Sequence, residues 1–93
     1  MLTVNEYFDG NVKSIALQTE TLPATVGVME AGDYEFGTSK KEVMTLVSGS
    51  MDVLLPGETE WKTFAQGASF EVAANVKFGV KTQGLVAYFC TYE

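Results

Sequence analysis

Residues 32–49 read GDYEFGTSKKEVMTLVSG and contain two short runs that predict strands, one in which apolar and polar residues alternate and one that is apolar apart from Thr45. In the first run Tyr34 and Phe36 fall on one face of an extended strand, and the second run covers residues 43–47. Alternation with a period of two is typical of a strand that is buried on one face. The polar residues between the two runs predict a turn, and the glycines at both ends of the segment predict strand ends.

The same pattern continues in both directions along the chain. Further runs are rich in Val, Thr, Phe and Tyr, which suit a pleated, half-buried surface, and they cover residues 12–18, 25–30, 51–55, 61–64, 69–72, 76–82 and 85–92. Turns containing Gly, Pro, Asn or Asp separate them at a spacing of roughly ten residues. Residues 5–8 suggest one short turn of helix, and no longer segment has a 3.6-residue period. The chain is therefore predicted to be all-β, as a sandwich or a barrel.

The length of 93 residues predicts one domain, residues 1–93. A chain of this size buries only about 60–65% of its unfolded surface, so its stability is small. Association into a homodimer is a common way to increase the stability of such a chain. No apolar run approaches the roughly 18–20 residues of a membrane span, and the first residues lack the pattern of a signal peptide. The single cysteine, Cys90, allows no intrachain disulfide. These features favour a reduced cytoplasmic protein.

The composition excludes several classes of function. The chain has no histidine and no arginine, because its 6 basic residues are all lysines. Without imidazole, a histidine-dependent hydrolase and a histidine-ligated metalloenzyme are both ruled out. The net charge of -6 argues against binding to nucleic acid or to an anionic membrane. The same charge gives no long-range attraction for an anionic substrate, so an anion would have to be held locally.

Two segments resemble the paired motifs of the cupin superfamily. Residues 32–49 have an opening Gly, a Glu at position 42 and a Gly seven residues later, and residues 67–78, GASFEVAANVKF, have a G-x-x-F-x-V start. The resemblance implies a cupin-type β-barrel, a jelly roll. The histidines of metal-binding cupins would fall on Thr38, Lys40 and Phe78, and only Glu42 remains of the usual ligand set. A single carboxylate does not hold a transition metal tightly, so we expect no metal and no cofactor.

The rest of the chain narrows the resemblance to one family. The string NEYFDGNVKSI (residues 5–15), followed by VGVM (26–29), EVMT (42–45), DVLLP (52–56), Trp61 and YFCTY (88–92), is similar to the small single-cupin pyrimidine/purine nucleoside phosphorylases. This resemblance covers nearly the whole chain. It implies phosphorolysis of many nucleosides to a free base and ribose 1-phosphate without a metal, and it adds to the expectation of a homodimer. One departure is Ala73, where the family usually has Pro, and this should loosen the turn before Phe78.

Phosphorolysis would need groups that hold phosphate beside an oxocarbenium-like sugar. Without arginine, those groups are lysines, hydroxyls or backbone N–H groups. The candidates for phosphate binding are Lys13 and Lys40, together with the turns at residues 38–41 and 48–50. The alternative for each lysine is a solvated surface charge. Thr38 is a candidate for substrate binding, and its alternative is a hydroxyl that shapes a turn.

Base binding and acid–base chemistry have their own candidates. Tyr34 and Phe36 share a face and are favoured for stacking on a base, because every base has a π face. Phe78 occupies a lost ligand position of the cupin motif and is expected to point into the cavity. The alternative for these rings is a place in the core. Glu42 is the catalytic candidate, because burial would raise its pKa and let it donate a hydrogen bond; the alternative is a relic carboxylate at the barrel mouth.

The residues alone leave three functions open. The first is a phosphorylase, the second is a binding module for a small sugar or nucleobase, and the third is a cupin that acts only through its dimer interface. The family resemblance favours the first. Cys90 is expected to be a small buried residue and no nucleophile, because the chain offers it no base, and Met44 is expected to pack in the core.

Overall fold

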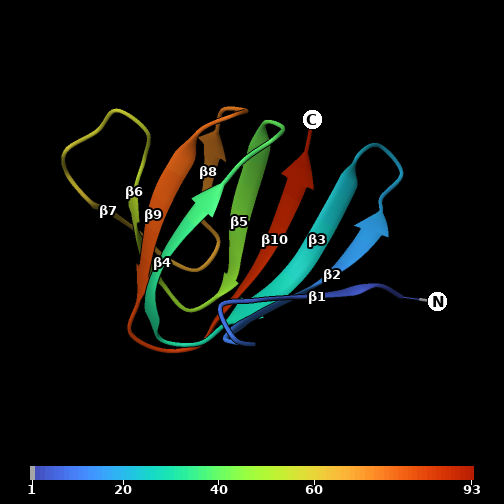
Figure 1. The fold of residues 1–93 in the computed structure, drawn as a ribbon, viewed down its shortest axis with the longest axis horizontal. Coiled ribbons are helices and arrows are strands. Elements are labelled where there is room, and N and C mark those ends of the chain that lie inside the picture. The colour runs from blue at the N-terminus through green and yellow to red at the C-terminus, as the bar shows by residue number, and fades with distance from the viewer. Residues whose placement is uncertain (1) are drawn as a thin grey trace.

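The computed structural model describes residues 2–93 and contains ten β-strands (Figure 1). The strands are β1 (Val4–Tyr7), β2 (Val12–Gln18), β3 (Pro23–Met29), β4 (Gly32–Gly37), β5 (Glu42–Ser48), β6 (Met51–Leu54), β7 (Lys62–Phe64), β8 (Ser69–Val72), β9 (Lys77–Thr82) and β10 (Val86–Tyr92). Within the described range there is no helix, and hence none that could cross a membrane. The all-β prediction is confirmed, and β2 to β10 begin and end within two residues of the predicted runs.

Strand β1 differs from the prediction. The turn of helix expected at residues 5–8 is wrong, because residues 4–7 pair antiparallel with β2 and place Tyr7 opposite Val12. Three of the four β1 residues are exposed. An edge strand that buries neither face shows no apolar alternation, and this removes the signal from which a strand is predicted.

The strands form two antiparallel sheets. The larger sheet has the order β1-β2-β3-β10-β5-β8, and the smaller has the order β4-β9-β6-β7. In Figure 1 the smaller sheet lies at the left and β1 to β3 lie at the right. The chain crosses from one sheet to the other as in a jelly roll, and ladder hydrogen bonds do not close the described strands into one continuous barrel. Near one end of the sheets, the Thr38 N–H donates to the Val76 carbonyl and the Asn75 N–H donates to the Thr38 carbonyl.

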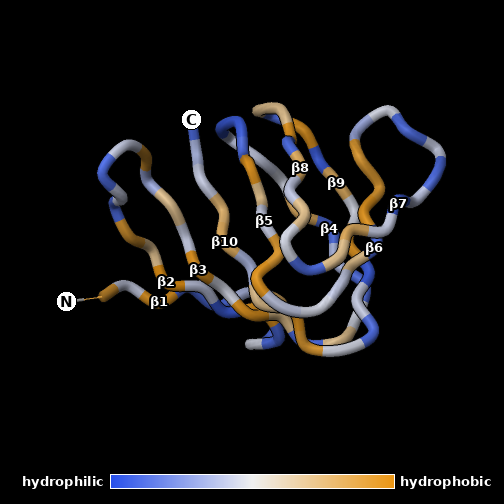
Figure 2. The backbone as a smooth tube through the Cα atoms, turned by 180° about the vertical axis from the view of Figure 1, so that it is seen from behind, coloured by the Kyte–Doolittle hydropathy of each residue, from blue (hydrophilic) through white to orange (hydrophobic). Residues whose placement is uncertain are grey.

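One hydrophobic core lies between the two sheets. Two ring contacts join the sheets there: Phe70 of β8 lies 4.7 Å from Phe64 of β7 and 6.3 Å from Phe78 of β9, between ring centroids. Figure 2 shows that apolar segments lie mainly along the strands and that the connections are mostly hydrophilic. The larger sheet contributes Val12, Met29, Met44, Leu46, Phe70, Val72, Val86, Tyr88 and Cys90, and the smaller sheet contributes Tyr34, Met51, Val53, Phe78 and Val80.

Candidate functional site

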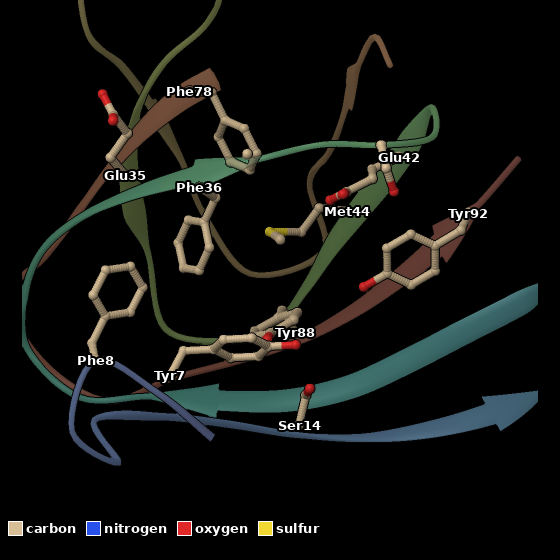
Figure 3. A pocket seen from close by; sticks show the side chains of 12 residues that line it. Tyr7, Phe8, Ser14, Glu35, Phe36, Glu42, Met44, Phe78, Tyr88 and Tyr92 are labelled. Carbon is tan, nitrogen blue, oxygen red and sulfur yellow. The ribbon is translucent and has the colours of Figure 1, made fainter. Parts of the chain in front are cut away.

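A cavity of about 490 Å³ lies between the sheets (Figure 3). Its volume falls in the range of about 300–1,000 Å³ that is usual for small-molecule sites. Strands β1, β2, β4, β5, β9 and β10 all contribute to its wall. The lining residues are Tyr7, Phe8, Ser14, Glu35, Phe36, Gly37, Ser39, Glu42, Met44, Phe78, Tyr88 and Tyr92.

One end of this cavity consists of aromatic rings, which we call the ring end: Phe8, Phe36 and Phe78. The Phe36 and Phe78 rings are stacked with centroids 5.7 Å apart, and the Phe8 ring meets Phe36 edge-on at 5.5 Å. Figure 3 shows the three rings on one side of the cavity, while the Glu35 carboxylate points away from them. No hydrogen-bonding side chain therefore projects from this group of rings into the cavity.

The other end carries oxygen atoms, and we call it the hydroxyl end: Ser14, Glu42, Tyr88 and Tyr92. Glu42 and Tyr92 are backbone partners of β5 and β10, and Figure 3 shows the Glu42 carboxylate and the Tyr92 hydroxyl directed into the cavity. The Tyr92 hydroxyl is also hydrogen-bonded to the Thr25 hydroxyl at 2.8 Å. Tyr7, from β1, lies beside Tyr88 and extends this polar wall.

The Glu42 carboxyl is half-buried and has no lysine partner among residues 2–93. Burial raises the pKa of Glu42 above its ordinary value, and a hydrogen bond from Cys90 opposes this rise. That bond runs from Cys90 Sγ to Glu42 Oε1 over 3.5 Å. The raised pKa lets the carboxyl keep its proton at a higher pH than an exposed glutamate would.

The phenols of the hydroxyl end stay protonated at neutral pH. Burial raises the pKa of Tyr88 to about 12, with the Ser14 hydroxyl opposing the rise. Burial likewise raises the pKa of Tyr92, and here the Thr25 hydroxyl opposes it. Both phenols can therefore donate hydrogen bonds to a ligand as well as accept them.

The structure brings three of the predicted site residues together in this cavity: Phe36, Glu42 and Phe78. Tyr34 lies behind the ring end, where its ring is 5.0 Å from Phe8. The Tyr34 hydroxyl donates to the Glu30 carbonyl at 2.6 Å.

Thr38 is buried and does not line the cavity. Its hydroxyl donates to the Ala73 carbonyl at 2.7 Å and accepts from the Val76 N–H at 3.1 Å. These bonds hold the β4–β5 connection against the turn between β8 and β9. The position of Thr38 thus agrees with the turn-shaping alternative, and its role in substrate binding stays a prediction.

The two predicted phosphate lysines lie outside the cavity wall. Lys13 is exposed on the outward side of β2, with its Nζ 3.6 Å from Glu6 Oε1. Lys40 is exposed in the β4–β5 connection, directly after Ser39, which does line the cavity. Both phosphate assignments stay predictions.

Several lining residues were not predicted from the sequence, because they come from different strands, and a local sequence pattern does not predict which strands pair. Tyr88 and Tyr92 share one face of their strand with Cys90 and are typical of core residues, and Ser14 is typical of an ordinary strand serine. The signal that could have found most of them is the family resemblance, because the segments that carry it include Tyr7, Phe8, Tyr88 and Tyr92.

A second cavity of about 500 Å³ lies on the outer face of the smaller sheet, under the loop that joins β6 to β7. Trp61 covers Gly79 there so closely that an added Cβ would lie 2.8 Å from the indole, and the Lys81 Nζ is 4.2 Å from the ring centroid. The carboxylates of this cavity, Asp33, Glu35 and Glu58, are all exposed, and Glu35, which also borders the first cavity, is paired with Lys77 at 3.9 Å. We therefore take the first cavity, with its half-buried and unpaired carboxyl, as the candidate site.

The candidate site offers stacking surfaces, hydroxyls and one protonatable carboxyl. Among residues 2–93, no three Cys, Asp or Glu side chains are grouped closely enough to hold a metal ion. The arrangement suits a ligand with a flat apolar part and a part rich in hydroxyls.

The sequence pattern of the family described as "Pyrimidine/purine nucleoside phosphorylase" matches residues 2–92. A Marinobacter nauticus protein of that name is 64% identical over 92 residues, which are 99% of each chain. A solved structure of a Vibrio parahaemolyticus protein of unknown function has a TM-score of 0.95 and 39% identity, and the match covers 100% of this chain and 99% of the other.

The expected cupin-type fold is confirmed by a more distant structural likeness. An RmlC-like cupin from Shewanella frigidimarina has a TM-score of 0.76 at 22% identity, over 98% of this chain and 82% of that one. At this level of identity the match shows the fold alone.

Proposed function

Since this chain belongs to the pyrimidine/purine nucleoside phosphorylase family, we propose that it transfers the pentosyl group of purine and pyrimidine nucleosides to inorganic phosphate. The bond between C1′ and the base nitrogen breaks, and a bond between C1′ and a phosphate oxygen forms. The base leaves as the free base once a proton has reached it, and the sugar leaves as ribose 1-phosphate. The observation that supports the proposal most is the half-buried Glu42 carboxyl between aromatic rings and hydroxyls in one cavity.

Glu42 is the proposed acid. Burial raises its pKa and so favours the protonated form, and a protonated carboxyl stabilises the negative charge that develops on a leaving base. Phe36 and Phe78 stack on the base, and Phe8, which Tyr34 supports from behind, closes the same wall. Thr38 acts indirectly, by fixing the connection that carries Ser39 and Lys40.

Lys40 is the proposed phosphate lysine. Among residues 2–93 the other five lysines have an ion pair or an aromatic partner, and Lys40 has neither. Its neighbour Ser39 lines the cavity and supplies a hydroxyl. A hydroxyl at the cavity wall and a flexible ammonium group on the next residue suit a small anion that the net charge of -6 does not attract.

The proposed assembly is a homodimer in the cytoplasm. Three apolar side chains lie in register on the outer face of the larger sheet: Ile15 of β2, Val26 of β3 and Phe89 of β10. Val26 and its neighbour Val28 are 46% and 47% exposed. These apolar side chains would be buried between two copies, so this part of the face, beside the exposed Lys13–Glu6 pair, is the proposed interface. Sedimentation should give a dimer for the natural chain and a monomer for Val26→Lys.

The experiment that tests the proposed reaction follows free base. The purified protein is incubated with uridine and with adenosine, each with and without phosphate. Base release that requires phosphate is the expected result. Tight nucleoside binding without release would favour the binding-module alternative, and no release with any nucleoside would overturn the proposed activity.

A further inference from the structure

We infer that the cavity binds a nucleoside in one direction only, with the base in the ring end and the sugar in the hydroxyl end. The inference rests on the proposed function, because it takes a nucleoside as the ligand of this cavity. It goes further by assigning each half of that ligand to named side chains. The Glu42 carboxyl then lies at the junction of the two halves, where the glycosidic bond breaks.

The ring end can bind a base only through its faces. Phe8, Phe36 and Phe78 have no hydrogen-bonding atoms in their side chains. The Phe8 and Phe78 ring centroids both lie within 5.7 Å of the Phe36 centroid. Stacking does not read the polar edge of a base, because every base has a π face. A purine and a pyrimidine therefore find the same surface there.

A sugar in the ring end would be poorly bound. Ribose hydroxyls would lose their hydrogen bonds to water and find no partner among three phenyl rings, which is costly for each buried hydroxyl. At the same time, the base would displace water from the hydroxyl end, and the face of a base would not replace the lost hydrogen bonds. The two mismatches add, and they favour the opposite direction.

The hydroxyl end offers what a sugar requires. Ser14, Tyr88 and Tyr92 each carry a hydroxyl that can donate or accept, and Glu42 adds a carboxyl. These groups come from three strands: β2, β5 and β10. The contact between Tyr92 and the Thr25 hydroxyl, at 2.8 Å, fixes one of them in place.

The order of side chains along β5 places the reacting bond. Glu42 and Met44 are two residues apart on one strand, so they project from the same face. In Figure 3 Met44 lies toward the rings, and Glu42 lies toward Tyr92. Glu42 therefore belongs to the hydroxyl end, on its side toward Met44 and the rings, and we assign the glycosidic bond to the space beside this carboxyl.

Two matched variants and two partial ligands test the inference. Phe36→Leu keeps the bulk of the side chain and removes the ring, and Tyr92→Phe keeps the ring and removes the hydroxyl. Adenine and ribose 1-phosphate are titrated by calorimetry into each variant and into the natural protein. We expect Phe36→Leu to weaken adenine binding about tenfold and ribose 1-phosphate binding less than about twofold, and Tyr92→Phe to do the reverse.

Controls keep the result interpretable. Thermal unfolding of each variant is measured beside the titrations, and if either fails to fold, Phe78→Leu replaces Phe36→Leu and Tyr88→Phe replaces Tyr92→Phe. Both variants weakening both ligands equally, or the reverse pattern, would overturn the assigned direction. So would a natural protein that binds neither ligand. Phosphate-dependent base release by the natural protein is scored separately, because its absence counts against the proposed function while the titrations decide the direction.

Discussion

The phenol of Tyr88 lies directly over Gly27, so that a Cβ added to Gly27 would overlap the Cζ and hydroxyl atoms of the ring. The two residues are backbone partners of β10 and β3, and Gly27 is in turn the partner of Ser14 on β2. The missing side chain lets the phenol lie across β3 toward β2. Tyr88 of β10 can therefore contribute to the cavity wall next to β2, although β3 lies between these two strands.

Gly27→Ala should disturb this wall. The methyl group meets the ring, and overpacking of this kind costs about 1–3 kcal/mol of unfolding free energy. Denaturant unfolding measures the loss, and the KM for nucleoside should rise because Tyr88 is displaced. The control is Gly84→Ala, since nothing lies within 4 Å of a Cβ built there. Equal stability of the two variants would show that the ring moves aside freely.

Glu42→Gln should lower kcat by about 10²–10⁴-fold, which is the usual contribution of a general acid. The amide keeps the size of the carboxyl but gives up no proton to the base. Thermal unfolding beside the kinetics separates the two effects. A variant that loses fold and activity in parallel would remove Glu42 from the mechanism.

The same variant should show a pH-dependent difference in stability. Burial raises the pKa of Glu42 in the folded protein above its ordinary value of 4.5. The stabilisation linked to this group is therefore fully present below the ordinary pKa and is lost as the pH rises through the raised one. Glutamine does not titrate, so Glu42→Gln should gain stability relative to the natural protein as the pH rises from the ordinary pKa through the raised one. A difference in unfolding free energy that stays constant over this range would contradict the shift.

Thr38→Val should lower stability more than it alters substrate binding. Without the hydroxyl, the Ala73 carbonyl and the Val76 N–H lose a partner, which costs about 1–3 kcal/mol for a buried group. Thr38→Ser keeps the hydroxyl and is the control. A raised KM for nucleoside in Thr38→Val, with unchanged unfolding, would instead show direct contact with substrate.

Lys40→Ala should raise the KM for phosphate several-fold and leave the KM for nucleoside unchanged. Lys13→Ala is the matched control, because it removes the same charge from the outward side of β2, where Lys13 faces Glu6. Initial rates at varied phosphate, at constant ionic strength, give both constants. Equal effects of the two substitutions would point to net charge rather than to a phosphate contact.

Local pattern predicted most of the fold, because eight of the ten strands, all except β1 and β7, contain buried residues. It did not predict β1, which buries neither face. For the site, the cupin motifs predicted Glu42 and Phe78, and shared strand parity predicted Phe36. Tyr88 could not be chosen over the other rings, because its place depends on Gly27 in a strand 61 positions earlier in the chain, and such a pairing is a property of the whole sheet.

Cys90, the single thiol of the chain, reports how often the sheet beneath Glu42 opens locally. Cys90 is 1% exposed, and burial raises its pKa to about 12, so a soluble disulfide reagent meets almost no thiolate in the closed protein. Labelling then proceeds only when β10 detaches from its neighbours, and its rate counts those openings. Any ligand that stabilises the pairing of β10 with its neighbours should slow the labelling of Cys90, and no dye or tag has to be introduced into the protein beforehand.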